Sequence, residues 1–441
     1  MIERYTLPEM AGLWTEQRKL ETWLEVELAI VDALAECGKI PDDAALRIRK
    51  QARFDLAKVQ ELEAVTRHDV LSFVECVGES LGDDSKYFHM GVTSSDVLDT
   101  ATALLLREAT EIILTELVEL RQVIRGLSAR HENTLIAGRT HGMHAEPTSL
   151  GLKFAVWYND VGRAIERIRA ALAEVSVGKV SGAVGNYSHL PPAVEEHALK
   201  LLCLGRERPA TQVVQRDRHA SYLASLALAA AVMEKMAVEL RHLQRTEVAE
   251  AEEPFTRGQK GSSSMPHKRN PITLERVTGL ARLIRSHAMA ALENVALWHE
   301  RDISHSSVER VIIPDATIAT HYIARCMKTV LSGLVVHPER MRKNLDLSGG
   351  MVYSQRLMLC LMEAGWERKR AYEKVQLLAH SGYASGKTLK ESACADEEIV
   401  SVLGEEAAGS VFDPVYYIRH VFETLKDIGI LEPGAEHGQV D

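Results

Sequence analysis

The sequence predicts an all-α protein built around a bundle of long helices. Apolar residues recur every three or four positions over runs of about 20–25 residues, which is the spacing of one face of an amphipathic helix. Aromatic residues make up only 5% of the 441 residues, whereas Ala, Leu, Glu and Arg, which favour helix, recur. Alternating patterns typical of half-buried strands are not apparent. We therefore expect helices packed side by side.

Five runs carry this spacing, and we take them in chain order: 106–127, 154–175, 223–240, 277–298 and a shorter one at 323–334. At a rise of 1.5 Å per residue, each long run corresponds to about 30–38 Å of helix. Rods of this length pack as a bundle. The third run is apolar around most of its circumference, which indicates burial on all sides and a homo-oligomer with an interface there.

Polar segments rich in Gly, Ser or Asp separate the runs: 78–96, 178–192, 257–275 and 346–355. Each one taken alone is most simply a connector between helices. Four such connectors in a chain with this much helix suggest that some of them carry functional residues, because functional groups concentrate in loops held by rigid scaffolds.

Composition narrows the classes of function. The net charge of −10 argues against nucleic-acid binding. The longest apolar run, 220–233, is too short to span a bilayer, and the first residues lack the pattern of a signal peptide. Six scattered cysteines without a C-x-x-C pair are expected to be reduced thiols. We expect a cytoplasmic protein that binds neither nucleic acid nor membrane.

The segment RGQKGSSSMPHKRNPITLE (257–275) combines three serines and two glycines with basic side chains. We expect Asn270 and Pro271 to be the N-cap and the first residue of the next helix. The positive end of that helix would then face the serines, beside Lys260, His267, Lys268 and Arg269. Such a field favours an alkoxide or an anionic ligand. The alternative is a solvated basic loop.

Three motifs resemble the fumarase/aspartase superfamily, whose members eliminate fumarate from succinyl compounds: SSSMPHKRNP (262–271), HMGVTSSDVLDT (89–100) and GRTHGMHAEPTSLG (138–151). Four others are similar to the adenylosuccinate lyase family within it: RYTLPEM (4–10), TRHDV (66–70), RDISHSSVER (301–310) and SQRLMLCLMEAG (354–365). The resemblance spans nearly the whole chain, and we find no departure at a motif position.

The resemblance implies a carbon–nitrogen lyase of purine nucleotide biosynthesis that cleaves adenylosuccinate to AMP and fumarate. The same site would cleave the succinylated aminoimidazole carboxamide ribotide. It also implies a homotetramer that needs no metal or organic cofactor. We expect a helical N-terminal domain over 1–111, a central bundle over 112–362 with the signature loop at 256–271, and a helical C-terminal domain over 363–441.

Elimination requires a base, an acid and groups that stabilise an anion. The proton leaves a carbon beside a carboxylate, and the carbanion delocalises into an aci-carboxylate dianion only where cations and N–H donors stabilise it. By resemblance Ser263 is the base, although the residues alone do not separate it from Ser262 or Ser264. The resemblance makes His141 the acid, a role suited to a side chain that titrates near neutrality, and His68 its partner.

The remaining assignments rest on the resemblance and on the need of phosphate and carboxylates for cations and hydroxyl donors. Lys268 and Glu275 join the catalytic group, with Glu275 holding Lys268 or a histidine. The positions expected to bind substrate are Arg4, Tyr5, Arg67, His68, Asp69, His89, Thr93, Ser94, Gln212, Lys268, Asn270, Arg301, Ser306 and Arg310.

Three alternatives compete with this assignment. A metal site at His141, His144 and Glu146 is discounted, because further ligands are not recognisable and Pro147 would break an aligning helix. Argininosuccinate lyase or the carboxymuconate-cyclising enzyme would not be expected to carry TRHDV together with RYTLPEM. A non-catalytic helical scaffold is opposed by the intact serine, histidine and lysine of the motifs.

The order of the motifs predicts active sites shared between subunits. His68 and His89 precede the long helices, His141 lies between the first two, and Ser263 precedes the fourth. Helices of about 30–38 Å can hold such loops too far apart for joint chemistry, whereas symmetric association brings one subunit's loop against another's. The resemblance implies three subunits per site.

Overall fold

The computed structural model describes residues 1–432 and confirms the all-α fold. The chain forms two compact units. Unit 1 comprises Met1–Leu120, Val161–Lys235 and Arg276–Lys328, and unit 2 comprises Arg121–Asp160, Met236–Glu275 and Thr329–Asp441. The division into 1–111, 112–362 and 363–441 stays a prediction, and residues 433–441 of its last part lie outside the described residues.

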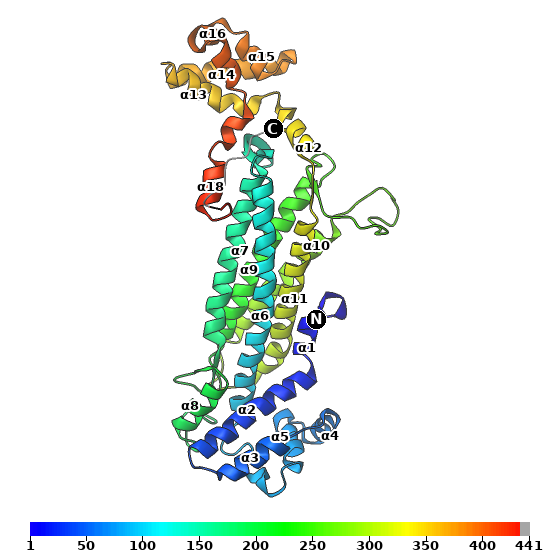
Figure 1. Ribbon diagram of the computed structural model, residues 1–441, viewed down its shortest axis with the longest axis vertical. Coiled ribbons are helices and arrows are strands. Elements are labelled where there is room, and N and C mark those ends of the chain that lie inside the picture. The colour runs from blue at the N-terminus through cyan, green and yellow to red at the C-terminus, as the bar shows by residue number, and fades with distance from the viewer. Residues whose placement is uncertain (433–441) are drawn as a thin grey trace. The chain divides into compact units, whose positions relative to one another are not determined.

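The predicted runs correspond to long helices, and their segments in unit 1 lie side by side (Figure 1). They are α6 (Ser94–Arg130), α7 (Leu150–Val175), α9 (Arg216–Leu243), α10 (Ile272–Glu293) and α11 (Ser304–Ser332). α6 and α11, with 37 and 29 residues, begin well before the apolar runs that predicted them. Their first turns are rich in Ser, Asp and His, so the apolar spacing does not extend into them.

The apolar spacing also overestimated the length of one helix, α10. Val295 and Trp298 continue the fourth run, yet α10 ends at Glu293 and these two side chains are 44% and 77% exposed. The N–H groups of Asn294 and Val295 bond to carbonyls three residues back. This tighter turn ends the helix.

Helix α9 is buried mainly by its own chain. Tyr222, Leu223 and Leu226 are fully buried, and the exposed residues over 217–235 are Asp217, Ser221, Leu228 and Lys235. This burial is consistent with the expectation that the third apolar run is buried on all sides. Most of its circumference is nevertheless covered without a second subunit.

Unit 1 also contains a cluster of shorter helices around Trp23 and Phe73, whose rings meet edge to face at 5.7 Å. α8 packs on α2, and a two-residue parallel pair joins β3 to β4. The elements are α1 (Pro8–Leu13), α2 (Glu16–Glu36), α3 (Asp42–Gln51), α4 (Leu56–Thr66), α5 (Asp69–Glu79), α8 (Pro192–Leu201), β3 (Val177–Gly178), β4 (Gly205–Arg206) and the 3-10 turns Glu3–Tyr5 and Gly82–Tyr87.

Unit 2 contains strands that the sequence did not predict. β1 (Leu135–Thr140) pairs antiparallel with β2 (Met143–Ser149), and β5 (Ala251–Glu252) with β6 (Val335–Val336). β1 does not alternate, because its first three residues are all buried. Pro147 lies next to a register shift between Ala137 and Arg139, where a proline is tolerated in a strand.

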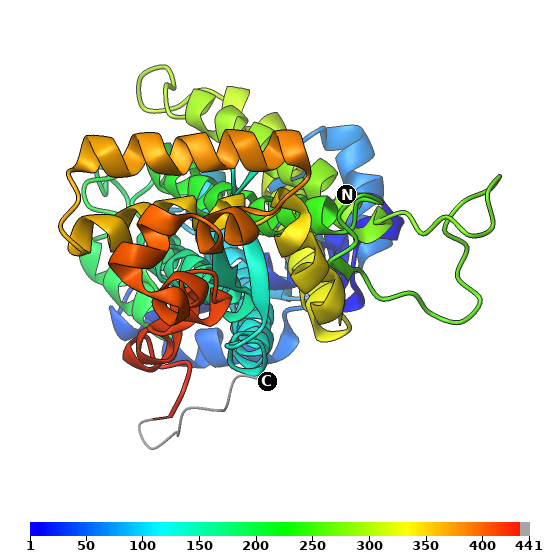
Figure 2. The same cartoon turned by 90° about the horizontal axis from the view of Figure 1, so that it is seen from above.

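The rest of unit 2 is a helical cluster with its own apolar core around Leu357, Leu361 and Leu389. α14, the long orange helix of Figure 2, packs against α13 and α15. The elements are α12 (Pro338–Leu345), α13 (Ser354–Glu363), α14 (Arg368–Ser385), α15 (Leu389–Cys394), α16 (Glu397–Leu403), α17 (Glu405–Ser410), α18 (Val421–Asp427) and the 3-10 turns Asp346–Ser348, Met351–Tyr353 and Pro414–Ile418. Over residues 1–432, no helix is long and apolar enough to cross a membrane.

A buried ion pair holds the turn that precedes α6. Lys179 Nζ donates to the carboxylate of Asp96 and to the carbonyl of Gly182 at 3.2 Å, and both charged side chains are 0% exposed. The same carboxylate accepts the N–H groups of Thr93 at 2.9 Å and Ser181 at 3.2 Å. The start of α6 is thereby fixed to the segment after β3.

We expect Lys179→Ala to lower the free energy of unfolding by about 3–5 kcal/mol, because Asp96 would remain buried without its cationic partner. Arg169→Ala removes an exposed ion pair with Glu166 and should cost at most about 1 kcal/mol. Urea unfolding of the two variants beside the unmodified protein tests this difference. Equal unfolding midpoints for the two variants would contradict it.

Candidate active site

The predicted site residues fall into both units of the chain. Unit 2 carries His141, Ser263, Lys268, Asn270 and Glu275. Unit 1 carries the others: Arg4, Tyr5, Arg67, His68, Asp69, His89, Thr93, Ser94, Gln212, Arg301, Ser306 and Arg310. His68 and His141, predicted as partners, therefore belong to different units.

In unit 1 the junction of α4 and α5 presents TRHDV. The ring Nδ1 of His68 accepts the N–H of Leu71 at 3.2 Å and so caps α5. The carboxylate of Asp69 accepts a hydrogen bond from Arg310 at 2.5 Å, across 241 residues of sequence. Burial alone would raise the pKa of Asp69, but its bond to Arg310 lowers that pKa overall. The structure thus brings two predicted binding residues together.

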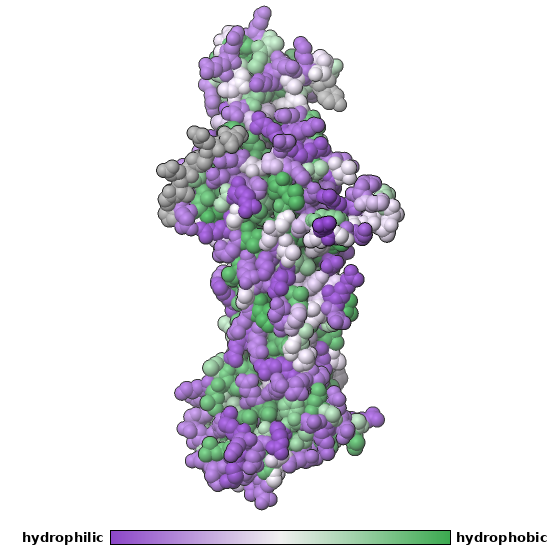
Figure 3. All heavy atoms as spheres, turned by 45° about the vertical axis from the view of Figure 1, so that its right-hand side comes forward, coloured by the Kyte–Doolittle hydropathy of each residue, from purple (hydrophilic) through white to green (hydrophobic). Residues whose placement is uncertain are grey.

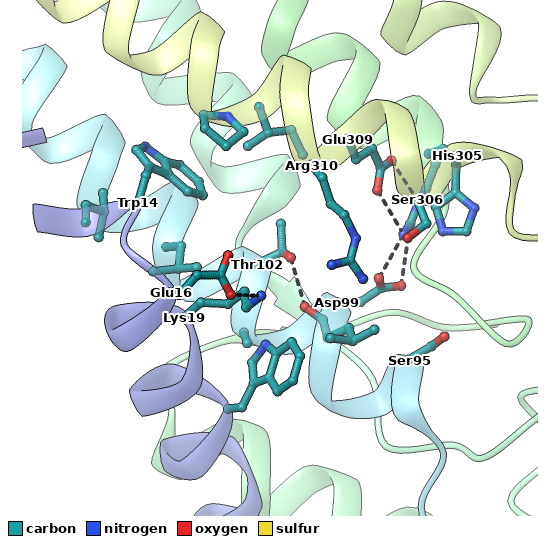
Figure 4. Close-up of a pocket in the computed structure, with 18 of the residues that line it drawn as sticks. Trp14, Glu16, Lys19, Ser95, Asp99, Thr102, His305, Ser306, Glu309 and Arg310 are labelled. Carbon is teal, nitrogen blue, oxygen red and sulfur yellow. Dashed lines mark hydrogen bonds and ion pairs between the residues drawn. The ribbon is translucent and has the colours of Figure 1, made fainter. Parts of the chain in front are cut away.

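Three predicted residues, Arg301, Ser306 and Arg310, line one cavity of about 230 Å³ in unit 1 (Figure 4). Arg301 donates to the Gln212 side-chain oxygen at 3.1 Å, which adds a fourth predicted residue to the group. Lys19 of α2 also lines the cavity. Cations and a hydroxyl group around a space of this size suit a phosphate or a carboxylate.

A buried ion network that the sequence did not reveal forms one wall of this cavity. The guanidinium of Arg216 on α9 meets Asp99 of α6 through two hydrogen bonds of 2.7 and 2.8 Å. It also approaches Glu309 of α11 at 3.1 and 3.3 Å. Arg216 begins α9 among other polar and charged residues, and its partners lie about a hundred residues away in sequence, so no local pattern distinguished it.

His89, a predicted substrate-site residue, is paired with a carboxylate that the sequence also did not reveal. Its Nδ1 lies 2.5 Å from Oε1 of Glu27, whose side chain is 0% exposed. Burial alone would lower the pKa of His89, but the hydrogen bond and the charge of Glu27 raise it overall. The imidazole is thereby held in its charged form more readily than a free histidine.

The other predicted residues of unit 1 lie at element ends. Ser94 begins α6, and Thr93 precedes it with its N–H bonded to Asp96. Arg4 and Tyr5 lie in the 3-10 turn Glu3–Tyr5, where Arg4 is exposed. The ring of Tyr5 packs edge-on against Tyr322 at 5.5 Å.

In unit 2 His141 lies at the tip of the β1–β2 hairpin. His141 and Gly142 both have positive φ, 55° and 79°, as a type I′ turn requires, and the imidazole is exposed. The hairpin is fixed through Arg139, which forms two hydrogen bonds of 2.9 and 2.6 Å with the buried carboxylate of Glu250. A rigid hairpin therefore presents the predicted acid.

Left-handed backbone conformations mark several of these positions. Arg67, His89 and His141 have φ of 53°, 59° and 55°. This conformation is uncommon outside glycine and is concentrated at functional sites. Tyr187, Cys203, Ala249 and His299, which are not predicted site residues, share this conformation, so it does not by itself distinguish the site.

The serine segment is an open excursion between β5 and α10 (Figure 2, in green). Ser263 and Lys268 are exposed in it. Its two arms meet where Asn270 Nδ2 donates to the carbonyl of Gly261 at 3.0 Å. A Cβ at Gly261 would lie 2.2 Å from the carbonyl oxygen of Lys268, so this crossing requires glycine.

The prediction for the start of the following helix was wrong. α10 begins at Ile272, and its N–H groups are capped by the carboxylate of Glu253, which accepts from Thr273 and from Leu274 at 3.2 Å each. Glu253 is 4% exposed. A buried carboxylate accepts these N–H groups more strongly than an amide could. The positive helix end is therefore already engaged, and Lys268 and its basic neighbours remain to stabilise an anion.

Lys268, Asn270 and Glu275 line a common open cleft with Arg241 of α9 and with Arg245, which follows that helix. The metal alternative assumed a helix around Pro147, whereas His144 and Glu146 lie on β2. Within the part of the chain that is described, no group of three or more His, Cys, Asp or Glu side chains is placed to hold a metal ion.

Comparison with known proteins agrees with the motifs. Residues 3–285 match the family model for lyases, and residues 350–428 the model for the adenylosuccinate lyase C-terminus. The chain is 52% identical to an adenylosuccinate lyase of Thermotoga maritima, over 96% of this chain and 98% of that protein. It is 46% identical to an adenylosuccinate lyase of Bacillus subtilis, over 98% of this chain and 100% of that protein.

A solved structure of a fumarate lyase from Mesorhizobium sp. BNC1 matches with a TM-score of 0.89 at 28% identity, covering 97% of this chain and 99% of that one. The sequence matches and this fold agree with the resemblance seen in the motifs. The chain belongs to the adenylosuccinate lyase family of the fumarase/aspartase superfamily.

Proposed function

We propose that the protein eliminates fumarate from adenylosuccinate to give AMP, and from the succinylated aminoimidazole carboxamide ribotide in the same site. The observation that carries the proposal is its identity of 46–52% with named adenylosuccinate lyases over nearly the whole chain. The exposed serine and histidine of the motifs support it, as does the unit 1 cavity with Arg301, Ser306 and Arg310. The expected location is the cytoplasm.

In the proposed mechanism Ser263, as an alkoxide, takes the proton from the carbon beside a succinyl carboxylate. The electron pair delocalises into that carboxylate, and Lys268 stabilises the resulting dianion. The C–N bond then breaks, and His141 donates a proton to the leaving nitrogen. Because Glu253 already caps α10, the helix end contributes little free positive charge, which makes Lys268 more important.

The residues of unit 1 would bind the nucleotide. Arg301 and Arg310 supply charge and Ser306 a hydroxyl group in one cavity, which suits the phosphate. His89, whose pKa is raised by its contact with Glu27, would face a carboxylate of the succinyl group.

We further propose a homotetramer whose sites combine residues of three subunits. The base and acid lie in unit 2, and most of the substrate-binding residues in unit 1. α10 exposes Leu283 at 45%, Met289 at 60% and Leu292 at 50%, and hydrophobic residues reach the surface of the bundle in Figure 3. A second copy of the chain covering such side chains would remove them from water.

Fumarate release from adenylosuccinate tests the proposed function directly. We expect the purified protein to release one fumarate per AMP formed, without added metal or cofactor. Release from the succinylated ribotide is expected under the same conditions. A protein that binds adenylosuccinate but forms no fumarate would support the non-catalytic scaffold instead.

Ser263→Ala and His141→Ala should each lower turnover by at least about 10²–10³, the scale expected for the loss of a positioned base or acid. Binding of adenylosuccinate should change much less. Ser262→Ala and Ser264→Ala are the matched controls and should retain most of the turnover. Near-normal turnover in Ser263→Ala would exclude it as the base.

The serine segment should become ordered when ligand binds. Its residues at 262–269 are exposed or half-buried and lie outside helix and strand, so few contacts oppose local opening. We expect amides of 256–266 to exchange rapidly in the free protein and more slowly with AMP and fumarate. Strong protection of these amides without ligand would contradict this expectation.

A further inference from the structure

The buried trio in one wall of the unit 1 cavity, Asp99, Arg216 and Glu309, has two acidic groups and one cation. Asp99 and Glu309 both face the single guanidinium of Arg216, and these three side chains are 7%, 13% and 3% exposed. If both carboxyl groups are ionised, the trio has a net charge of −1. A net charge buried away from water is energetically unfavourable, and the binding of one proton to the trio removes it.

The geometry indicates which carboxyl group takes the proton. Asp99 receives two short bonds from Arg216 and a third, of 2.8 Å, from the N–H of Val214. The contacts of Glu309 with Arg216 are longer, at 3.1 and 3.3 Å, and Nδ1 of His219 lies 3.9 Å from its Oε1. Burial would raise the pKa of Asp99, but the charge of Arg216 lowers it overall. Burial raises the pKa of Glu309 to about 7, against the opposing effect of Arg216.

The other titratable groups around the trio are less suited to carry this proton. Burial and the charge of Arg216 lower the pKa of His219 on α9 to about 3 and that of His305 on α11 to about 4. On α2, Lys19 pairs with Glu16. Asp69 of α5 is held by Arg310, and Arg301 contacts Gln212. Glu309 is left as the group that titrates near neutrality.

We propose that an anion bound beside Arg310 is accompanied by proton uptake on Glu309, which makes this residue a positioning and proton-linked partner of the anion site. Glu309 directly precedes Arg310 and lies three residues after Ser306, and all of them line the cavity. An anion there repels an ionised Glu309 and therefore favours its neutral form. The identity of the anion as the substrate's phosphate rests on the proposed function.

The linkage between anion binding and protonation of Glu309 fixes how anion affinity depends on pH. At a pH below the pKa that Glu309 has in the anion-free protein, the proton is already bound, and anion affinity is insensitive to pH. Above it the proton must be taken up on binding, so affinity falls by up to about tenfold per pH unit. Glutamine at 309 keeps the neutral form at every pH, and Glu309→Gln should remove this dependence.

Sulfate is the appropriate probe, because it stays a dianion from about pH 6 to about pH 9, whereas phosphate titrates in this range. Trp14 and Trp23 line the cavity, so tryptophan fluorescence can follow sulfate binding. We expect affinity to fall up to about tenfold per pH unit above about pH 7 in the unmodified protein and to stay level in Glu309→Gln. Arg310→Ala should lose sulfate binding, which locates the site.

The matched control is His305→Gln, which removes the nearby imidazole and should keep the pH dependence. The same dependence in Glu309→Gln as in the unmodified protein would overturn the proposal, as would a level profile in the unmodified protein. If Glu309→Gln does not fold, the fallback is calorimetry of sulfate binding to the unmodified protein in buffers of different protonation enthalpy, which counts the protons taken up. The absence of proton uptake near pH 8 would overturn the proposal. These measurements need no turnover, so they are independent of the fumarate assay.

Discussion

A guanidinium buried between two carboxylates, that of Arg216, fixes three helices of unit 1 to one another. Asp99 on α6 and Glu309 on α11 can keep their places only while Arg216 on α9 lies between them, because a buried carboxylate without its partner is strongly destabilising. Apolar contacts would allow these helices to slide by small amounts. Hydrogen bonds between charged groups have a direction, and they set the position of the cavity residues on α11.

Buried carboxylates hold the other predicted functional segments in the same manner. Asp96 fixes the turn with Thr93, Glu250 fixes the hairpin with His141, and Glu253 fixes the end of the serine segment. None of these carboxylates belongs to the predicted site itself. Each binds backbone N–H groups or a cation beside it, so that exposed catalytic groups are placed by buried ones.

The sequence predicted the helices because burial repeats every three to four residues along each of them. Helix ends were less predictable, since α6 begins among polar residues that carry no apolar spacing. The cap of α10 was mispredicted because Glu253 lies 20 residues before Thr273, and a local pattern favours Asn270. Ser263, His141 and the binding residues were recognised from motifs. Arg216 lies in no motif and Glu309 has no role implied by its motif, because their pairing depends on contacts between distant segments.

The central claim is that one copy's serine acts with another copy's histidine, and mixing of inactive variants tests it most directly. Equimolar Ser263→Ala and His141→Ala proteins are dissociated, reassembled and assayed for fumarate release. With random assortment about a quarter of the sites receive both unmodified groups, so about a quarter of the normal activity should return. If verified mixed oligomers stay as inactive as either parent, both groups belong to one chain's site and the account is contradicted.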